Sequence, residues 1–171
     1  MLRSAFTCSS RLAMSSIPIT VQGAKLIEAE LERLKTVERP DVINAIAEAR
    51  AQGDLSENAE YDAARERQAF VEGKIRELEG TLSNAQIIDP ADLDANDQIV
   101  FGATVTLLDM ESEEEVKYQI VGDVESDIRQ GKISVLSPVA RALIGKTEGD
   151  VTEVQTPGGV REFEIIEVSY R

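Results

Sequence analysis

The stretch GDLSENAEY, residues 53–61, places two carboxylates, Asp54 and Glu57, three positions apart between two long helical patterns. Two hard oxygen ligands at such a turn suit Mg²⁺, which takes one or two carboxylates from a protein and keeps several waters. Two carboxylates alone bind the ion weakly, so this site needs further ligands from a partner. The alternative is a capping box, in which the Asp accepts a backbone N–H and the Glu reaches back. The spacing alone favours the cap.

Three arginines and one tyrosine flank these acids. Arg50, Arg65 and Arg67 lie within a few helical turns of them. They could pair with nearby acids on the helices, or they could form a local positive collar that steers a phosphate backbone towards the carboxylates. The sequence leaves both interpretations open. Tyr61 is interpreted as helix packing in preference to a stacking platform for an RNA base.

The composition argues against a catalytic site that is complete within the chain. The 171 residues contain no His, the commonest general base near neutral pH, and a single Cys, Cys8, which allows no internal disulfide. The phosphate-binding, dinucleotide-binding and zinc motifs of self-contained enzymes are also missing. The net charge is −14, so any contact with nucleic acid must come from a local basic patch or through a partner. No apolar run approaches the ~20 residues that span a bilayer.

Two long helical patterns flank the acids and must position them. The first is interrupted where Pro40 predicts a kink or a new start near residues 38–39, and it ends at Gly53. The second runs from about Glu57 to Asn84. Because the break is short, we expect antiparallel neighbours with the acids at the tip of a rod of roughly 45 Å. The predicted apolar stripes are Ile27, Leu31, Leu34, Val42, Ile43, Ile46 and Ala49, and Ala64, Gln68, Val71, Ile75, Leu78 and Leu82.

The composition changes after the second helix. Residues 87–98, IIDPADLDANDQ, concentrate Pro, Asp and Asn and are predicted to be a linker. Residues 99–171 contain β-rich runs, a short helix that opens at Ser137-Pro138 and a TPGG turn, which predict a small, mainly antiparallel sheet with one helix. The prediction is therefore an α+β chain with a coiled-coil hairpin domain, residues 17–86, ahead of the sheet domain.

The first residues differ from the rest of the chain. Residues 1–13, MLRSAFTCSSRLA, contain two Arg and no acid, as transit peptides do, but they are short for one and Met14 offers a second start. We therefore expect residues 1–16 to be a disordered extension rather than a targeting signal.

These motifs together resemble the Gre transcript cleavage factors, GreA type. GDLSENAEYDAARE, with RPDVINAIAEARAQ before it and LSNAQIID after it, is similar to the tip and flanks of that family. VFGATVTLLD, YQIVGD, ISVLSPVARALIGKTEGD and TPGG resemble its C-terminal domain in order. The resemblance covers residues 17–170, and the tip motif is highly specific. The N-terminal extension has no counterpart in the bacterial pattern.

The resemblance implies a bacterial, cytoplasmic partner of RNA polymerase. In this family the hairpin enters the secondary channel of the polymerase, and an FKBP-like C-terminal domain docks at the channel mouth. Ser137 and Pro138 match the docking loop. Asp54 and Glu57 match the acids that stabilise the second Mg²⁺ of the polymerase active site and its attacking water. Backtracked nascent RNA is then cut near its 3′ end, and stalled elongation resumes.

The resemblance also assigns roles to the basic residues and implies where Mg²⁺ is bound. Arg50 and Arg65 match basic positions that meet the RNA, and we place Arg67 in the same RNA-contacting set. The Mg²⁺ is shared with the polymerase, and we expect none to bind to the chain alone. The acidic surface favours a monomer.

Other functions remain as alternatives at this point. Some relatives keep the fold and inhibit the polymerase with an altered tip, so a non-cleaving secondary-channel regulator is the main competitor. The intact acid pair favours an active cleavage factor over it. A prolyl isomerase rests on the FKBP-like fold alone, and aromatics at 4% of the chain argue against a proline pocket.

Overall fold

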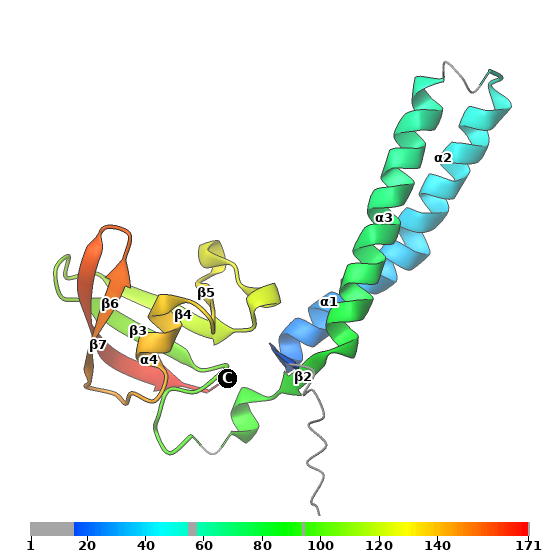
Figure 1. Cartoon of the computed structure of the whole chain (residues 1–171). Helices are drawn as coiled ribbons and strands as arrows, with labels where there is room; N and C mark the ends of the chain where they lie inside the picture. Colours follow the sequence, from blue (N-terminus) through cyan, green and yellow to red (C-terminus); the bar gives the residue numbers. More distant parts are fainter. Residues whose placement is uncertain (1–15, 55–57, 94, 171) are drawn as a thin grey trace, which may run out of the picture.

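The computed structural model describes residues 16–54, 58–93 and 95–170 of the chain. A long helical hairpin projects from a small domain that is built on a curled sheet (Figure 1). The predicted α+β architecture, with the hairpin ahead of the sheet, is confirmed. Within the described part of the chain, no helix is long and apolar enough to cross a membrane.

The described residues form three groups of elements. The hairpin contains α1 (Val21–Arg33), the π-helical segment Leu34–Glu38, α2 (Arg39–Ala51) and α3 (Ala59–Ser83). The sheet domain contains β3 (Thr104–Asp109), β4 (Glu115–Val121), β5 (Lys132–Ser134), α4 (Pro138–Leu143), β6 (Val151–Thr156) and β7 (Gly159–Ser169). β1 (Ile17–Thr20) and β2 (Ala85–Ile88) pair at the base of the hairpin.

The first arm of the hairpin passes from α1 to α2 through the π-helical segment. Pro40 carries no N–H, so it cannot donate to the carbonyl four residues earlier. The N–H of Arg39 donates to the carbonyl of Leu34, five residues earlier, and Pro40 falls in the first turn of α2, where proline is tolerated. The predicted restart near residues 38–39 is thus confirmed as a π-bulge. Residues 21–51 give the arm a length of roughly 46 Å.

An apolar seam holds α2 against α3. Val42 and Ile46 of α2 face Val71 and Ile75 of α3, and none of these four side chains is more than 7% exposed. Burial of such a side chain contributes about 1.5–3 kcal/mol. The prediction that Ile43 belongs to this stripe is wrong, because its side chain is 51% exposed. One residue is about 100° of rotation on a helix, which turns Ile43 out of the seam.

The sheet of the second domain has the strand order β5-β4-β3-β7-β6. β3 is antiparallel to both β4 and β7, and β6 is antiparallel to β7 across the predicted TPGG turn. β5 is the exception to an antiparallel sheet, because it pairs with β4 in parallel. The connection between these strands contains two short 3₁₀ turns, Asp123–Glu125 and Ile128–Gln130, which return the chain to its starting edge.

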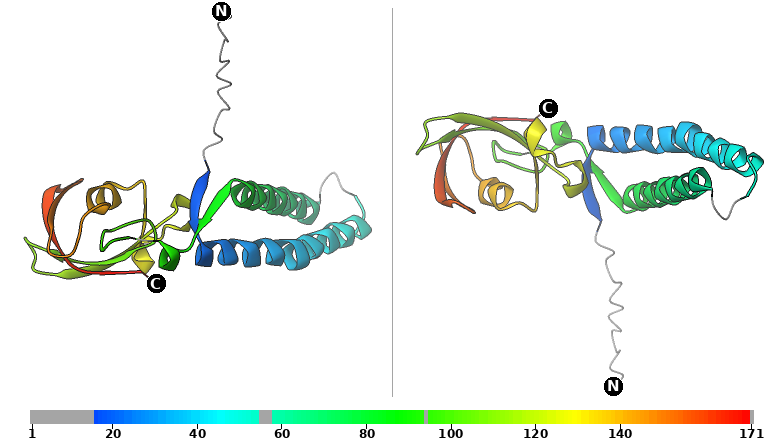
Figure 2. Two further views of the ribbon diagram at one scale, coloured as in Figure 1. Left: turned by 90° about the horizontal axis from the view of Figure 1, so that it is seen from below. Right: turned by 90° about the horizontal axis from the view of Figure 1, so that it is seen from above.

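The sheet curls around α4, and the core of this domain lies between them (Figure 2). Ala140 and Leu143 of α4 are fully buried. β3 alternates partly exposed and buried residues along its length, so one face of the strand, with Val105 and Leu107, points into this core. The register shift between Thr106 and Leu107 marks a bulge, which increases the twist of the sheet.

A two-stranded sheet at the base of the hairpin was not predicted. β1 and β2 pair in parallel, with Ile17 opposite Ala85. Each strand has four residues and adjoins a long helix, so its own pattern is too short to be distinguished from the helical one. β2 runs into residues 87–98, the segment predicted as a linker, and the turn Pro90–Asp92 follows.

One carboxylate joins the hairpin to the sheet domain. Glu125 accepts hydrogen bonds from the backbone N–H of Thr20 (2.9 Å), from its hydroxyl (2.5 Å) and from the N–H of Gly122 (3.1 Å). Thr20 is the N-cap of α1, and a negative charge there is stabilised by the helix dipole. Two glycines, Gly23 and Gly122, leave room for this contact. A Cβ on Gly23 would lie 1.8 Å from the Glu125 carboxylate, and one on Gly122 would lie 2.2 Å from the carbonyl oxygen of Pro18.

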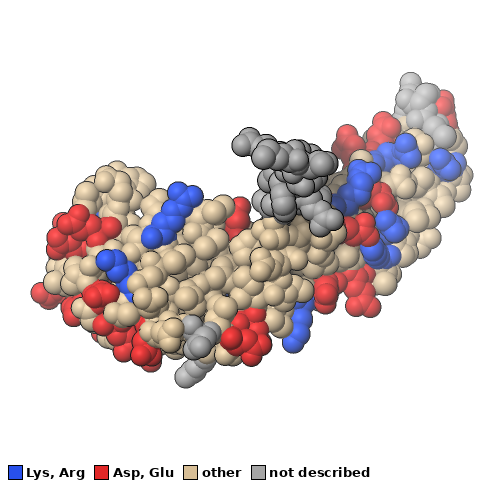
Figure 3. Space-filling model, turned by 60° about the horizontal axis from the view of Figure 1, so that its bottom comes forward, with Lys and Arg blue, Asp and Glu red and all other residues tan. Residues whose placement is uncertain are grey.

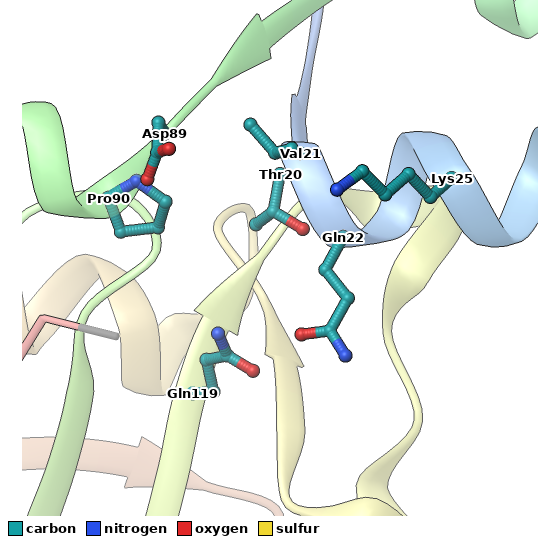
Figure 4. Close-up of a pocket in the computed structure, with 7 residues that line it drawn as sticks. All are labelled: Thr20, Val21, Gln22, Lys25, Asp89, Pro90 and Gln119. Carbon is teal, nitrogen blue, oxygen red and sulfur yellow. The ribbon is translucent and has the colours of Figure 1, made fainter.

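A cavity of about 390 Å³ opens beside this junction (Figure 4). Its lining side chains come from the end of β1, from α1 and β4 and from the segment after β2, and they are Thr20, Val21, Gln22, Lys25, Asp89, Pro90 and Gln119. The Thr20 hydroxyl donates to Glu125, and the Asp89 carboxylate accepts the N–H of Ala91 at 3.0 Å. These polar groups therefore serve local structure, and the cavity is a space between the two domains.

We expect Gly122→Ala to weaken the junction between the domains, because the new Cβ meets backbone rather than a flexible side chain. Such overpacking costs about 1–3 kcal/mol. Thermal unfolding followed by circular dichroism, with small-angle scattering to detect separation of the domains, measures the effect. Gly73→Ala is the matched control. That glycine lies inside α3 with nothing within 4 Å of the new Cβ, so the change should stabilise the helix by up to about 1 kcal/mol. Equal behaviour of the two variants would show that the close contact at Gly122 is not required.

Candidate functional site

The tip of the hairpin begins where α2 ends. Gln52 is the last residue in the helical region, and Gly53 has φ +115°, a conformation that favours glycine. Asp54 follows directly and is exposed. Its predicted partner Glu57 lies outside the described residues. The chain thus presents at least one carboxylate to solvent at the far end of the first arm.

A capping box between Asp54 and Glu57 involves Glu57, which lies outside the described residues, so it stays a prediction. The N-cap of α3 is a different residue. α3 begins at Ala59, and its N-cap is Asn58, whose side-chain oxygen accepts the N–H of Tyr61 at 3.1 Å. The helix therefore starts four residues later than a cap at Asp54 requires. Asn is as good an N-cap as Asp, so the spacing of the acids gave no means of choosing between the two positions.

The side chain of Asn58 also contacts the other arm. Its amide nitrogen donates to the carbonyl of Ala49 in α2 at 2.8 Å. Tyr61 makes a second contact between the arms, because the guanidinium of Arg50 lies 5.8 Å from the centre of its ring. Tyr61 is partly buried against the apolar seam, which confirms its interpretation as helix packing.

The three arginines predicted to contact RNA have different surroundings. Arg50 and Arg65 are both exposed. Arg50 contacts the Tyr61 ring, and Arg65 donates to the side chain of Gln68 at 3.1 Å. Neither has a carboxylate within 4.0 Å among the described residues. Among the described residues, both guanidiniums near the tip therefore lack the carboxylate partners found along the shaft.

Arg67 is engaged differently. Its guanidinium forms an ion pair with Glu38 at 2.6 Å, which ties α3 to the π-helical segment. Glu38 also accepts from Arg33 at 2.8 Å, so one carboxylate serves two guanidiniums. Hydrogen bonds from Arg67, and then from Arg33, hold the pKa of Glu38 below its ordinary value. Arg67 was predicted to contact RNA, and the structure places it in a contact between the helices.

Further ion pairs follow the shaft of the hairpin. Arg39 binds Glu72 through two hydrogen bonds of 2.6 and 2.7 Å, and Lys35 lies 2.5 Å from Glu79. Both pairs join the first arm to α3. Figure 3 shows Lys and Arg interspersed with Asp and Glu along the hairpin, whereas acids dominate the visible face of the sheet domain. Most positive charge on the shaft is therefore neutralised locally, in contrast to Arg50 and Arg65.

Ser137 and Pro138, the predicted docking residues, form the start of α4. The Ser137 hydroxyl accepts the N–H of Ala140 at 3.2 Å, so the predicted cap is confirmed. The preceding Leu136 is 58% exposed and lines an apolar groove of about 360 Å³. The groove is lined by Ser16, Ile17, Pro18, Asp123, Val124, Val135 and Leu136. An exposed apolar surface thus lies directly beside the predicted docking loop.

The described residues do not assemble a metal site of their own. No group of three or more His, Cys, Asp or Glu side chains that could hold a metal lies within the described ranges. The exposed carboxylate of Asp54 is a hard oxygen donor of the kind that Mg²⁺ takes. This donor set fits an ion whose other ligands come from a partner.

Fold and tip together define a class of protein with an exposed carboxylate near the far end of a helical rod and a separate sheet domain. The family models for the N-terminal and C-terminal domains of the transcription elongation factors GreA and GreB match residues 17–87 and 94–170. The chain belongs to the GreA/GreB family of transcription elongation factors.

Two relatives agree with this assignment. The chain is 64% identical over 157 residues to transcription elongation factor GreA of Alkalilimnicola ehrlichii and 66% identical over 157 residues to that of Neisseria meningitidis serogroup A. Each match covers 92% of this chain and 99% of the relative. Among solved structures, GreA factor homolog 1 of Thermus thermophilus is 29% identical with a TM-score of 0.42, over 90% of this chain and 99% of the homolog.

Two residues of the tip and shaft were not found from the sequence. Asn58 was not recognised as the cap, although an Asn directly before the periodic pattern of the second helix is a known start signal. Glu38 was not recognised as a shared partner of two arginines. Glu38 and Arg67 are 29 positions apart in the chain, so no local sequence pattern predicts that they pair.

We expect Glu38→Gln to lower the melting temperature of the hairpin at pH 7, because it removes the charge that Arg33 and Arg67 share. Folding lowers the pKa of this carboxyl, so its stabilisation is fully present above the unfolded pKa of about 4.3 and is lost as the pH falls through the lowered folded value. The difference in melting temperature between wild type and variant should therefore shrink as the pH is lowered from 5 towards 3. A difference that stays constant over this range would contradict the role of the ion pairs.

Proposed function

We propose that this chain inserts the tip of its hairpin into the secondary channel of a bacterial RNA polymerase and stimulates Mg²⁺-dependent cleavage of backtracked nascent RNA by the polymerase active site. The observation that carries this proposal is the exposed Asp54 at the far end of a rod of roughly 46 Å, in a chain of the GreA/GreB family. Cleavage releases the displaced 3′ end of the RNA, and the stalled complex resumes elongation.

The chemistry assigned to the tip is support of a metal site. Hydrolysis of a phosphodiester with two metals uses ions about 3.5–4 Å apart, which clamp the attacking and leaving oxygens. The second Mg²⁺ would be held by polymerase groups together with Asp54 and Glu57, and the chemistry it would supply is ionisation of a water that acts as nucleophile. The part of this chain is to bring carboxylate oxygens to the ion and to orient them. A metal-bound water ionises without an imidazole base, which is consistent with a chain that contains no His.

The shape of the chain suits an active site that belongs to another molecule. A slender hairpin can reach the bottom of a channel that a globular domain cannot enter, and its interhelical ion pairs oppose bending. The sheet domain would remain at the channel mouth, where Ser137, Pro138 and the apolar groove beside Leu136 dock on the polymerase. The protein then acts as an accessory factor to the polymerase rather than as an independent enzyme.

The central test is replacement of the tip acids. We expect Asp54→Asn and Glu57→Gln each to lower the rate of stimulated cleavage by roughly 10- to 100-fold, the order seen when a group that supports a catalytic metal is lost. The measurement is release of short 3′ fragments from purified backtracked complexes at saturating factor and fixed Mg²⁺. Binding to the polymerase should stay within about twofold of wild type.

Asp62→Asn is the matched control, because it makes the same chemical change on the exposed first turn of α3. We expect it to cleave as wild type does. If wild type binds the polymerase and releases no fragments, the chain is a non-cleaving regulator of the secondary channel. If both tip variants cleave normally, the carboxylates do not support the metal.

The basic residues give a separate prediction. We expect Arg50→Gln and Arg65→Gln to raise the factor concentration needed for half-maximal cleavage and to make it less sensitive to salt. Loss of one phosphate contact to single-stranded nucleic acid lowers the slope of log affinity against log salt by about 0.7. Arg67→Gln should leave that slope unchanged and lower thermal stability, because its guanidinium is paired with Glu38. Equal salt slopes for all four proteins would rule out contacts of Arg50 and Arg65 with RNA.

A further inference from the structure

One side chain connects the two arms of the hairpin at the tip. Asn58 uses both functions of its amide: the oxygen accepts the N–H of Tyr61 in α3, and the nitrogen donates to the carbonyl of Ala49 in α2. The partners fix the orientation of the amide, since a carbonyl can only accept and an N–H can only donate. The Asn58 side chain therefore forms a hydrogen bond with a terminal backbone group of each helix.

Both of these backbone groups lie at helix ends, and the carbonyl of Ala49 also accepts the N–H of Gln52 at 3.3 Å, so Asn58 is its second donor. The first four N–H groups and the last four carbonyls of an α-helix have no intrahelical partner. Tyr61 is the third residue of α3, and Ala49 is the third from the end of α2. Ala49 is only 2% exposed, so its carbonyl lies at a buried position. A second contact, from Arg50 to the Tyr61 ring, joins the same two turns.

We infer that Asn58 is a positioning residue for the reaction, one that fixes both ends of the loop that carries Asp54. This inference rests on the proposed function. Asp54 follows the end of α2 by three residues, so its carboxylate can be held in one place only if the ends of the two arms keep a fixed separation. Catalysis that depends on a metal ligand is sensitive to displacements of about 1 Å. Asn58 acts through backbone contacts and touches no reacting atom, so it supports the carboxylate without being a ligand.

Few residue types can fill this position. An Asp would keep the bond from Tyr61 N–H and would cap the helix as well as Asn does, but it has no hydrogen to donate to Ala49. A Ser would keep the cap with a side chain one bond shorter. The substitution Asn58→Asp therefore removes the connection between the arms and leaves the start of α3 intact, since an acid at the first turn is also favoured by the helix dipole.

The matched control lies at the other end of the hairpin. Asn84 is the C-cap of α3, and its amide donates to the carbonyl of Gly80 at 3.0 Å, within its own helix. Asn84→Asp makes the same chemical change far from the tip. Its effect on stability can be compared with that of Asn58→Asp without any change in the loop that carries Asp54.

The first measurement uses the free protein and does not depend on the polymerase. We expect ¹⁵N relaxation to give lower order parameters for the Gly53 and Asp54 amides in Asn58→Asp than in wild type, moving from the range of rigid backbone, about 0.85, towards that of flexible segments, below about 0.6. Asn84→Asp should match wild type. Unchanged order parameters in Asn58→Asp would overturn the inference.

The second measurement separates positioning from simple stabilisation. In cleavage of backtracked complexes, we expect Asn58→Asp to lower the maximal rate about tenfold at saturating factor while the half-saturating concentration stays within twofold of wild type. Asn84→Asp should change neither. The inference would be overturned if Asn58→Asp cleaved at the wild-type maximal rate. It would also be overturned if the loss of maximal rate were accompanied by matching changes in the melting temperature and in the half-saturating concentration. Absence of cleavage by wild type would refute the proposed function instead, and the order parameters alone would then decide whether Asn58 fixes the loop.

Discussion

The architecture of the tip depends on a constraint that applies to every helix: its terminal backbone groups need partners from outside the helix. Here an amide, Asn58, satisfies an N–H of α3 and a carbonyl of α2. The cap of α3 is therefore a neutral amide that also contacts the other arm, and Asp54, three residues after the end of α2, is exposed to solvent. One side chain thus joins the two arms close to the acid.

The rod can place that ligand only if it resists bending at its weakest points. Pro40 interrupts the hydrogen bonds of the first arm, and the chain absorbs the interruption as a π-bulge. The interhelical pairs of Glu38 with Arg67 and Arg39 with Glu72 lie beside this bulge and tie it to α3, which is regular throughout. At the base, the Glu125 carboxylate ties the start of α1 to the sheet domain. A single exposed ion pair contributes little to stability. A network of pairs that spans the bulge stabilises the part of the rod where the backbone is least constrained.

Much of this architecture could be predicted from the sequence, because it follows from local chemistry. The heptad seam, the restart at Pro40, the Ser137 cap and the TPGG turn each depend on residues within a few positions of one another. The failures have a common cause in contacts between distant parts of the chain. Asp54 and Asn58 are equally good caps by type, and the bond to Ala49 in the other arm favours the second. The pairing of β1 with β2, like the parallel pairing of β5 with β4, is likewise set by partners far away in sequence.

The distribution of charge resolves an apparent conflict between composition and function. A net charge of −14 opposes contact with RNA, but charges in water act over a Debye length of about 8 Å at physiological salt. Residues 85–171, which include the sheet domain, contain 18 acids and 7 bases, a net charge of −11. A rod of roughly 46 Å separates them from the tip, so their charge is screened there. What a phosphate meets at the tip is set by the residues of that turn. Arg50 and Arg65 keep their charge because no described carboxylate pairs with them, whereas Arg33, Arg39 and Arg67 are neutralised along the shaft. The length of the hairpin therefore keeps the two arginines near the tip electrostatically independent of the acidic sheet domain.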